Sequence, residues 1–154
     1  TSDKQMKLST LETEQWIPRK PLELFPFFAE AENLEHLTPP WLHFRIVSPR
    51  VEMRAGAKID YRLRVHGIPL KWRSEITVWE PPFRFVDEQT RGPYRAWIHE
   101  HKFESRDGGT LMRDTVQYAA IGGALARKFL VAPDLVKIFN FRKARLESIF
   151  GGAH

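Results

Sequence analysis

Two histidines, at positions 99 and 101, are separated by a single residue within the stretch YRAWIHEHKF. Side chains alternate between the two faces of a β-strand, so both imidazoles share a face with Trp97 and Phe103. The opposite face offers far less apolar surface. The spacing therefore predicts that His99 and His101 point into the interior, although imidazoles titrate near neutral pH and serve as proton donors, proton acceptors and metal ligands.

Three further polar side chains are expected inside for the same reason. In the segment Phe83–Gln89, the large apolar residues share their face with Asp87 and Gln89. In the segment Thr110–Tyr118, they share it with Asp114. A buried carboxylate is costly unless it is paired, so the two aspartates are expected to bond to the two histidines.

Turn lengths predict how the strands are aligned. The RGP turn pairs Asp87 with His99, and the DGG turn pairs Phe103 with Thr110, which sets His99 opposite Asp114. Direct neighbours on adjacent strands lie roughly 4.5–5.5 Å apart at Cβ. The sequence thus predicts a row of Asp87, His99 and Asp114 across three strands.

Three interpretations of this row remain open. It is a self-satisfied polar network in a core, or it lines a pocket and meets oxygen atoms of a ligand, or it ligates zinc or iron through the His-x-His pair and an aspartate. The carboxylates serve equally well as histidine partners, so no metal ligands are assigned. Ser74 is the only serine expected inside, and nothing marks it as an activated nucleophile.

The chain of 154 residues is expected to form one domain over 8–151, after a flexible tail at 1–7. The absence of cysteine excludes disulfides and thiolate chemistry. The sequence has no apolar run of about 18 residues and opens on no signal peptide, so we expect no transmembrane segment and a cytoplasmic location.

Lysine and arginine outnumber aspartate and glutamate by 24 to 19, which gives a formal net charge of +5. No dense basic run is present, so a solvated surface is the simplest interpretation, and no specific nucleic-acid partner is expected. Weak contact with anionic surfaces is the alternative, because the outward positions of two expected strands carry a set of cations: Lys58, Arg62, Arg64, Lys71 and Arg73.

The hydrophobic pattern predicts one strand, short helices, a long antiparallel sheet and a C-terminal helix, in that order. Strict alternation with a period of two indicates a sheet with one apolar and one polar face. The expected elements are a strand at Leu8–Ile17, helices at Pro21–Glu32 and Asn33–Leu37, and strands at 59–65, 70–78, 83–89, 94–103 and 110–118.

The last helix is expected to begin near Ala124 and to be kinked or divided at Pro133. Gly122 and Gly123 are interpreted as hinge or helix-entry residues. One face of this helix forms an apolar stripe of Leu135, Ile138, Phe139, Leu146, Ile149 and Phe150, and the cations Arg142, Lys143 and Arg145 lie between these residues in the sequence. The stripe is the expected cover for the apolar face of the sheet.

The segments WEPPFRFVDEQTRGPYRAWIHEHKFE, GGTLMRDTVQY, AENLEHLTPPWLHFRI and FRKARLESIFG resemble bacterial ligand-binding proteins of the START/Bet v 1-like (SRPBCC) superfamily. The polyketide cyclase/dehydrase and lipid-transport group is the most similar named group. The resemblance implies an α+β helix-grip fold, in which a curved seven-stranded antiparallel sheet wraps around a long C-terminal helix. It also implies two short helices between the first two strands and an internal cavity.

The resemblance further implies that the cavity holds a hydrophobic small molecule, such as a lipid, an isoprenoid or a polyketide-like ring, and that the protein is a carrier or sensor. The alternative is a cyclase/dehydratase-type enzyme, in which His99 is the acid/base, Asp87 and Asp114 orient it, and His101 or Tyr118 polarises a carbonyl. No phosphate-binding glycine loop follows a strand, and no cofactor is expected. The expected ligand-binding residues are Tyr61, Trp72, Phe85, Gln89, Trp97, His101, Met112, Tyr118 and Phe139.

Overall fold

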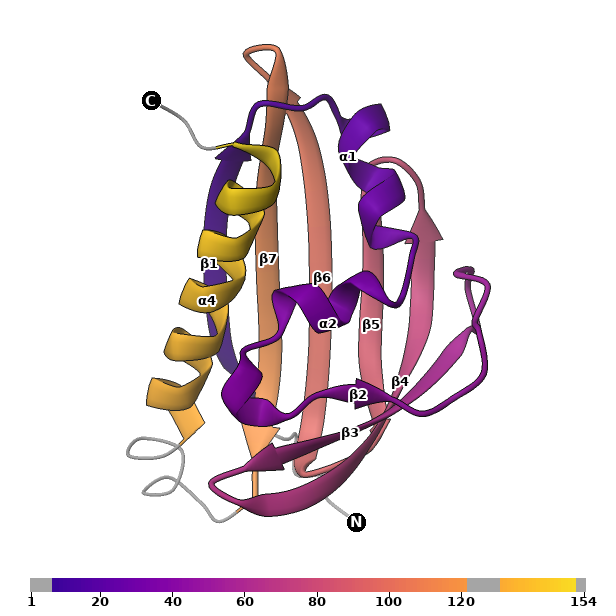
Figure 1. Ribbon diagram of the computed structural model, residues 1–154, viewed down its shortest axis with the longest axis vertical. Helices are drawn as coiled ribbons and strands as arrows, with labels where there is room; N and C mark the ends of the chain where they lie inside the picture. The colour runs from indigo at the N-terminus through magenta and orange to yellow at the C-terminus, as the bar shows by residue number, and fades with distance from the viewer. Residues whose placement is uncertain (1–6, 122–130, 152–154) are drawn as a thin grey trace.

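A computed structural model describes residues 7–121 and 131–151. Seven antiparallel strands form one curved sheet, and the helices lie in its concavity (Figure 1). The strands are β1 (Ser9–Ile17), β2 (Arg45–Ile46), β3 (Lys58–Val65), β4 (Ile68–Glu80), β5 (Arg84–Arg91), β6 (Tyr94–Arg106) and β7 (Gly109–Ala120). The helices are α1 (Pro21–Phe28), α2 (Asn33–Leu37), the 3-10 turn η1 (Pro40–Leu42) and α4 (Ala132–Phe150).

The strand order across the sheet is β1-β7-β6-β5-β4-β3-β2. The helix-grip α+β fold expected from the resemblance is therefore confirmed, with α1 and α2 between the first two strands. Figure 1 shows α4 lying along the β1 and β7 side of the concave face, with α1 and α2 beside it. None of the described helices combines the length and the hydropathy that a bilayer-spanning helix requires.

The long helix begins at Ala132, with Pro133 in its first turn. Proline is well tolerated there, because the N–H groups of the first turn have no partner within a helix. Pro133 thus lies at the start of a helix. The expected helical residues from Ala124, and the expected hinge at Gly122 and Gly123, lie outside the described residues, as does nearly all of the predicted tail, and these expectations stay predictions.

The alignment of β5 with β6 is as the sequence predicted. Asp87 lies opposite His99, and Phe85 lies opposite His101. Both histidines are buried on the concave face. The expectation that this strand turns its imidazoles inward is therefore confirmed.

The predicted alignment of β6 with β7 is wrong by two residues. The turn between these strands contains only Asp107 and Gly108, which both have positive φ angles, of 50° and 77°. Such a two-residue turn matches the twist of a hairpin. As a result, His101 lies directly opposite Asp114, and His99 lies opposite Val116, two pairs further along.

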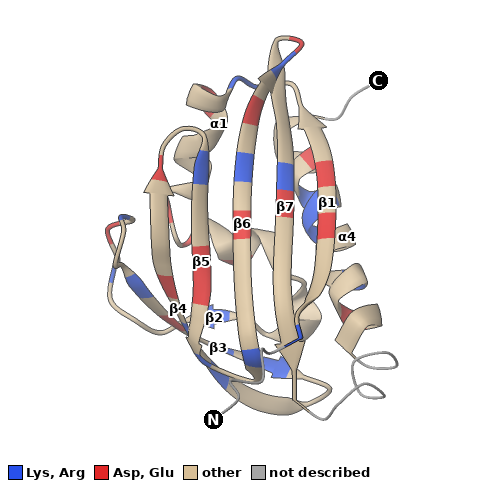
Figure 2. Cartoon of the chain, turned by 180° about the vertical axis from the view of Figure 1, so that it is seen from behind, with Lys and Arg blue, Asp and Glu red and all other residues tan. Residues whose placement is uncertain are grey.

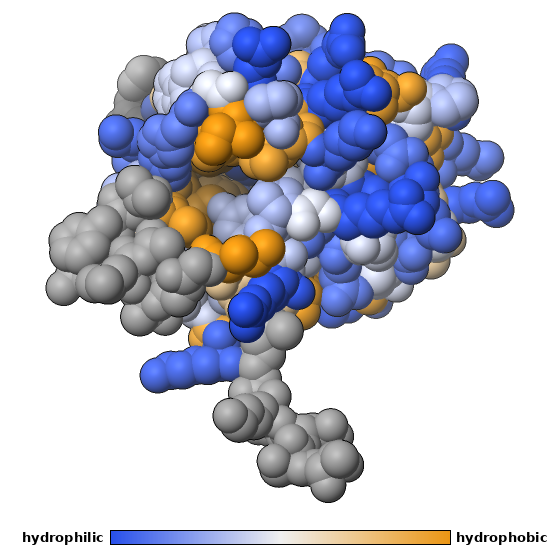
Figure 3. Space-filling model, turned by 90° about the horizontal axis from the view of Figure 1, so that it is seen from below, coloured by the Kyte–Doolittle hydropathy of each residue, from blue (hydrophilic) through white to orange (hydrophobic). Residues whose placement is uncertain are grey.

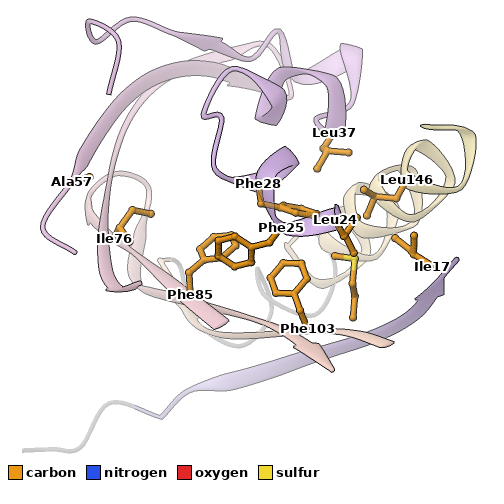
Figure 4. Close-up of a cluster of buried hydrophobic side chains, with 11 residues drawn as sticks. Ile17, Leu24, Phe25, Phe28, Leu37, Ala57, Ile76, Phe85, Phe103 and Leu146 are labelled. Carbon is orange, nitrogen blue, oxygen red and sulfur yellow. The ribbon is translucent and has the colours of Figure 1, made fainter. Parts of the chain in front are cut away.

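Two groups of apolar side chains fill the space between the sheet and the helices. The larger joins α1, α4 and the sheet, and its phenylalanine rings meet edge to face (Figure 4). Phe103 lies at its centre, with ring centroids 5.1 Å from both Phe25 and Phe28. The smaller group contains Val116, Tyr118, Leu135 and Phe139.

Truncation of the central ring tests the energetic weight of the larger group. Phe103 is 2% exposed, so Phe103→Ala removes a fully packed ring and leaves a void. We expect the free energy of unfolding to fall by about 3–5 kcal/mol, measured by urea denaturation. Phe83→Ala is the matched control, because the Phe83 side chain is 59% exposed and its removal should cost less than about 1 kcal/mol. Equal losses of stability in the two variants would contradict the placement of Phe103 at the centre of the larger apolar group.

Candidate functional site

Four polar side chains from three adjacent strands meet on the concave face, between the two apolar groups. Asp87 Oδ2 bonds to His101 Nε2 at 2.7 Å. Asp114 Oδ1 bonds to His99 Nε2 at 2.8 Å and lies 3.2 Å from His101 Nδ1. The predicted row is thus formed, but His101 takes the central place that was expected for His99, because the two-residue turn shifts β7.

Arg142 completes this cluster from α4, and the sequence interpretation missed it. Its Nη2 lies 3.4 Å from Asp114 Oδ1, and the side chain is buried. The buried positions of α4 are Leu135, Phe139, Arg142 and Leu146, which follow one another at spacings of four, three and four. Arg142 therefore occupies a regular position of the apolar stripe, and that spacing is the signal that identifies it.

Ring stacking holds the central imidazole in place. His101 lies between the ring of Phe85, at 3.9 Å between centroids, and that of His99, at 3.7 Å. The planes are inclined by only 11° and 26°. Because the ring is fixed on both faces and bonded at both nitrogens, His101 has little freedom to reorient.

The pKa values of the two histidines shift in opposite directions. Burial lowers the pKa of both imidazoles. For His101, hydrogen bonds to Asp114 and Asp87 outweigh burial, so its pKa is raised above the ordinary value. For His99, burial and repulsion by His101 outweigh the hydrogen bond to Asp114, so its pKa is lowered. Of the two imidazoles, His101 is therefore the one that keeps its proton to higher pH.

The carboxylates stay ionised although they are buried. Burial raises the pKa of Asp114, but the charge of Arg142 and the bonds from the histidines outweigh it, and the pKa lies well below the ordinary value. The pKa of Asp87 is lowered in the same way, chiefly by the bond from His101. When His101 is protonated and His99 is neutral, two carboxylates face two cations, His101 and Arg142, and the charge of the cluster is balanced.

This balance fixes which ring nitrogens carry protons. A protonated His101 donates from Nε2 to Asp87 and from Nδ1 to Asp114, so the approach of Arg142 Nη2 to that Nδ1, at 3.3 Å, is not a hydrogen bond. A neutral His99 donates from Nε2 to Asp114. Its Nδ1 is then an acceptor and lies 3.9 Å from Asp87 Oδ2, too far for a hydrogen bond.

A metal ion fits this arrangement poorly. Ligand atoms of Asp87, His99 and His101 lie within 4.8 Å of one another, as a metal would require. The Asp87 oxygen is nevertheless already bonded to His101, and the guanidinium of Arg142 adds a fixed positive charge beside them. Since a divalent cation would have to displace these bonds and face that charge, we assign no metal ligands.

An internal cavity adjoins the cluster and has two lobes of about 140 Å³ and 170 Å³. His99 and Arg142 line both lobes and so stand where the lobes meet. Aromatic rings form much of the remaining wall. Viewed from the end where β7 finishes and α4 begins, apolar side chains surround a hollow (Figure 3). The residues common to both lobes are Leu37, Thr38, Phe44, Tyr61, Trp72, Trp97, His99 and Arg142.

The expected wall residues divide into two sets. Six of them line a lobe: Tyr61, Trp72, Phe85, Trp97, His101 and Phe139. The other three, Gln89, Met112 and Tyr118, line neither lobe. Met112 and Tyr118 pack in the two apolar groups. The side-chain amide of Gln89 donates to the backbone carbonyl of Tyr94 at 2.7 Å and accepts from the backbone N–H of Tyr94 at 3.1 Å. The expectation that all nine residues line the cavity was too broad, because part of the concave face of the sheet is packed core.

A bonded trio of side chains forms the far wall of the cavity. The hydroxyl of Ser74 lies 2.8 Å from the Tyr61 hydroxyl and accepts the indole N–H of Trp72 at 3.0 Å. Burial raises the pKa of Tyr61 well above its ordinary value, with a further contribution from Asp87. Ser74 thus orients two wall rings and has no adjacent base that would make it a nucleophile.

Comparisons with known proteins agree with this fold. Residues 17–134 match the family model described as polyketide cyclase/dehydrase and lipid transport. The curated protein sequences yield no significant match. Protein CV1439 from Chromobacterium violaceum is 10% identical, with a TM-score of 0.74 over 94% of this chain and 98% of that one.

Two further solved structures extend the likeness. Protein Ms6760 from Mycobacterium smegmatis is 17% identical, with a TM-score of 0.65 over 93% of this chain and 95% of that one. Major latex-like protein 151 from Panax ginseng is 9% identical, with a TM-score of 0.67 over 93% and 97%. At these identities the structural likeness establishes the fold alone.

The opposite pKa shifts of the two histidines are directly measurable. In an NMR titration, we expect His101 to remain protonated above pH 6.5 and His99 to remain neutral below it, since 6.5 is the ordinary value from which the two shift apart. Asp114→Asn should lower the pKa of His101, because one of its two carboxylate partners is lost.

The same shifts set the pH dependence of stability. A raised pKa at His101 stabilises the fold below pH 6.5, and this contribution is lost as the pH rises through the folded value. A lowered pKa at His99 makes the stability fall as the pH drops from 6.5 towards the folded value. Two imidazoles that titrate together, near the ordinary value, would contradict the charge assignment.

Proposed function

The chain belongs to the polyketide cyclase/dehydrase and lipid transport family, and from this premise we propose that it binds a small hydrophobic molecule in the internal cavity as a carrier or sensor. The observation that carries the proposal is a two-lobed cavity rich in aromatic rings, with the charged cluster around His99 and Arg142 where the lobes meet. Apolar walls supply affinity through burial, at roughly 25 cal/mol per Å². A few converging polar groups supply orientation.

The size of the lobes favours rings over long acyl chains. A cavity of about 150 Å³ accommodates a single benzene-sized molecule, and the two lobes measure about 140 Å³ and 170 Å³. A molecule with one or two rings fits this space, whereas a membrane lipid with two acyl chains would need far more. Of the classes expected from the sequence, a polyketide-like ring therefore suits the cavity best.

The polar groups between the lobes suit a carbonyl or hydroxyl oxygen. Nε of Arg142 is buried and has no hydrogen-bond partner among the described residues. An unsatisfied buried donor costs about 1–3 kcal/mol, which a ligand oxygen can recover. In a neutral His99 that donates from Nε2 to Asp114, Nδ1 is an acceptor, so a ligand hydroxyl can donate there.

A matched pair of ligands tests this proposal. 1-Tetralone and tetralin share one bicyclic skeleton and differ in a single carbonyl. We expect both to bind, with tetralone about tenfold tighter because of its hydrogen bond to Arg142. Quenching of tryptophan fluorescence or calorimetry measures the two affinities, since Trp72 and Trp97 line both lobes.

Arg142→Met should abolish the preference for tetralone and leave the affinity for tetralin unchanged. Arg145→Met is the control, because Arg145 lies on the same helix and bonds instead to the carbonyl of His36. A protein that binds neither ligand, or that prefers palmitate to both, would refute the proposal.

Catalysis is the second candidate function, and one observation favours it. A neutral His99 beside a charged His101 is the arrangement in which neighbouring groups take the roles of base and acid. His99 Nδ1 would remove a proton from the carbon next to a ligand carbonyl, and Arg142 would stabilise the oxygen. The β-hydroxyl group would then leave with that proton as water, and an enone would remain. Tyr118, the other expected carbonyl partner, lines neither lobe, so Arg142 takes its place.

3-Hydroxy-1-tetralone tests this second candidate, because loss of water converts it to fluorescent 1-naphthol. An enzyme working through His99 should lose about 100-fold or more in kcat on His99→Asn. His36→Asn is the control, since His36 lies on the exposed surface of α2. Turnover that survives His99→Asn would exclude the role of His99. If the protein binds tetralone but shows no turnover, only the carrier or sensor function remains.

A further inference from the structure

A row of three cations crosses the outer face of the sheet at one edge. Arg45 on β2 lies directly opposite Arg62 on β3, which lies directly opposite Lys71 on β4. Like charges in such direct pairs destabilise a sheet. No ion pair joins any of the three to another residue in the described part of the chain. We call Arg45, Arg62 and Lys71 the basic row.

Elsewhere on this face, several cations have acidic partners (Figure 2). Directly beside the basic row, Arg73 bonds to Asp60 at 2.7 Å and 3.2 Å. A second row of cations, Arg84, Lys102 and Arg113, has a glutamate oxygen within 2.7 Å, 3.7 Å and 2.9 Å of its members. The basic row differs from these pairs because its three cations lie directly opposite one another with no carboxylate between them, and their repulsion costs stability that an external anion would recover.

The surroundings of the basic row indicate the kind of anion. Together with Arg64 and His43, the row lines a shallow surface depression of about 670 Å³. Exposed aliphatic side chains lie at the same end of the molecule, where β4 and α4 begin and β7 finishes (Figure 1). They are Ile68, Ile121 and Val136, which are 61%, 58% and 48% exposed. Figure 3 shows this end, with apolar groups around the hollow and long hydrophilic side chains beside them.

We propose that this end of the molecule docks on a bilayer that contains anionic lipids. The basic row meets the headgroup charges, and the exposed aliphatic side chains enter the boundary between headgroups and acyl chains. A nucleic acid would also neutralise the cations, but it would leave the aliphatic side chains without a partner, since bases stack on aromatic rings. The basic row lies on the outer face of the sheet, so its charge does not depend on what the cavity holds.

Vesicle cosedimentation tests the proposal. The protein should bind vesicles of phosphatidylcholine mixed with phosphatidylglycerol, should not bind phosphatidylcholine alone, and should be released by salt. Arg62→Glu with Arg64→Glu should weaken partitioning by about 25-fold or more, from about fivefold for each cation lost. Arg19→Glu with Lys20→Glu makes the same change of charge between β1 and α1, at the opposite end, and should retain binding.

The single variant Arg62→Glu separates docking from folding. It changes the basic row to alternating charges, so the melting temperature should rise by about 2–5 °C while vesicle binding falls. A lower melting temperature would show that the row is not under repulsion. Equal loss of binding in the two double variants, equal binding to uncharged vesicles, or binding to polyuridylate in place of vesicles would each overturn the proposal.

Discussion

The need to pair buried charge at Asp114 determines how the helix and the sheet fit together. One of its oxygens faces donors on two elements, with His99 Nε2 at 2.8 Å, His101 Nδ1 at 3.2 Å and Arg142 Nη2 at 3.4 Å. A carboxylate without these partners would be strongly destabilised inside the molecule. Apolar contacts hold α4 against the sheet but tolerate rotation and sliding, whereas the contact with Arg142 is directional. The polar cluster thus gives the interface its register.

The same cluster explains why the interior contains a cavity. It divides the apolar side chains into two groups, one around Phe103 and one around Phe139. Side chains bonded to one another cannot move to fill the space beside them, because any movement would break a charged hydrogen bond. The wall opposite is equally fixed, since Ser74 holds the polar edges of Tyr61 and Trp72. Rigid rings and fixed ion pairs therefore leave a void of defined shape, which flexible aliphatic side chains would have closed.

Sequence reasoning succeeded where a strong periodicity or a short turn left few alternatives. The alternation around Trp97 and Phe103 placed both histidines inside, and the RGP turn gave the correct pairing with Asp87. It failed where two local solutions were equally plausible. The DGG sequence accommodates a loop of two residues or a longer one, and only the positive φ angles of Asp107 and Gly108 distinguish them. Arg142 was named among the cations between the stripe residues and given no role in the site, although its spacing matched the buried stripe.

The two faces of the sheet use positive charge in opposite ways. On the concave side, each cation has a carboxylate partner, and burial makes the pairing obligatory, because the effective dielectric constant is low. On the outer side, water weakens the repulsion within the basic row enough for Arg45, Arg62 and Lys71 to remain side by side. An unpaired charge is therefore only weakly destabilising on the outer face, and only there can it contact a large external partner. Paired charge inside the molecule fixes the geometry of the cavity, whereas the unpaired charge of the basic row can attract external anions.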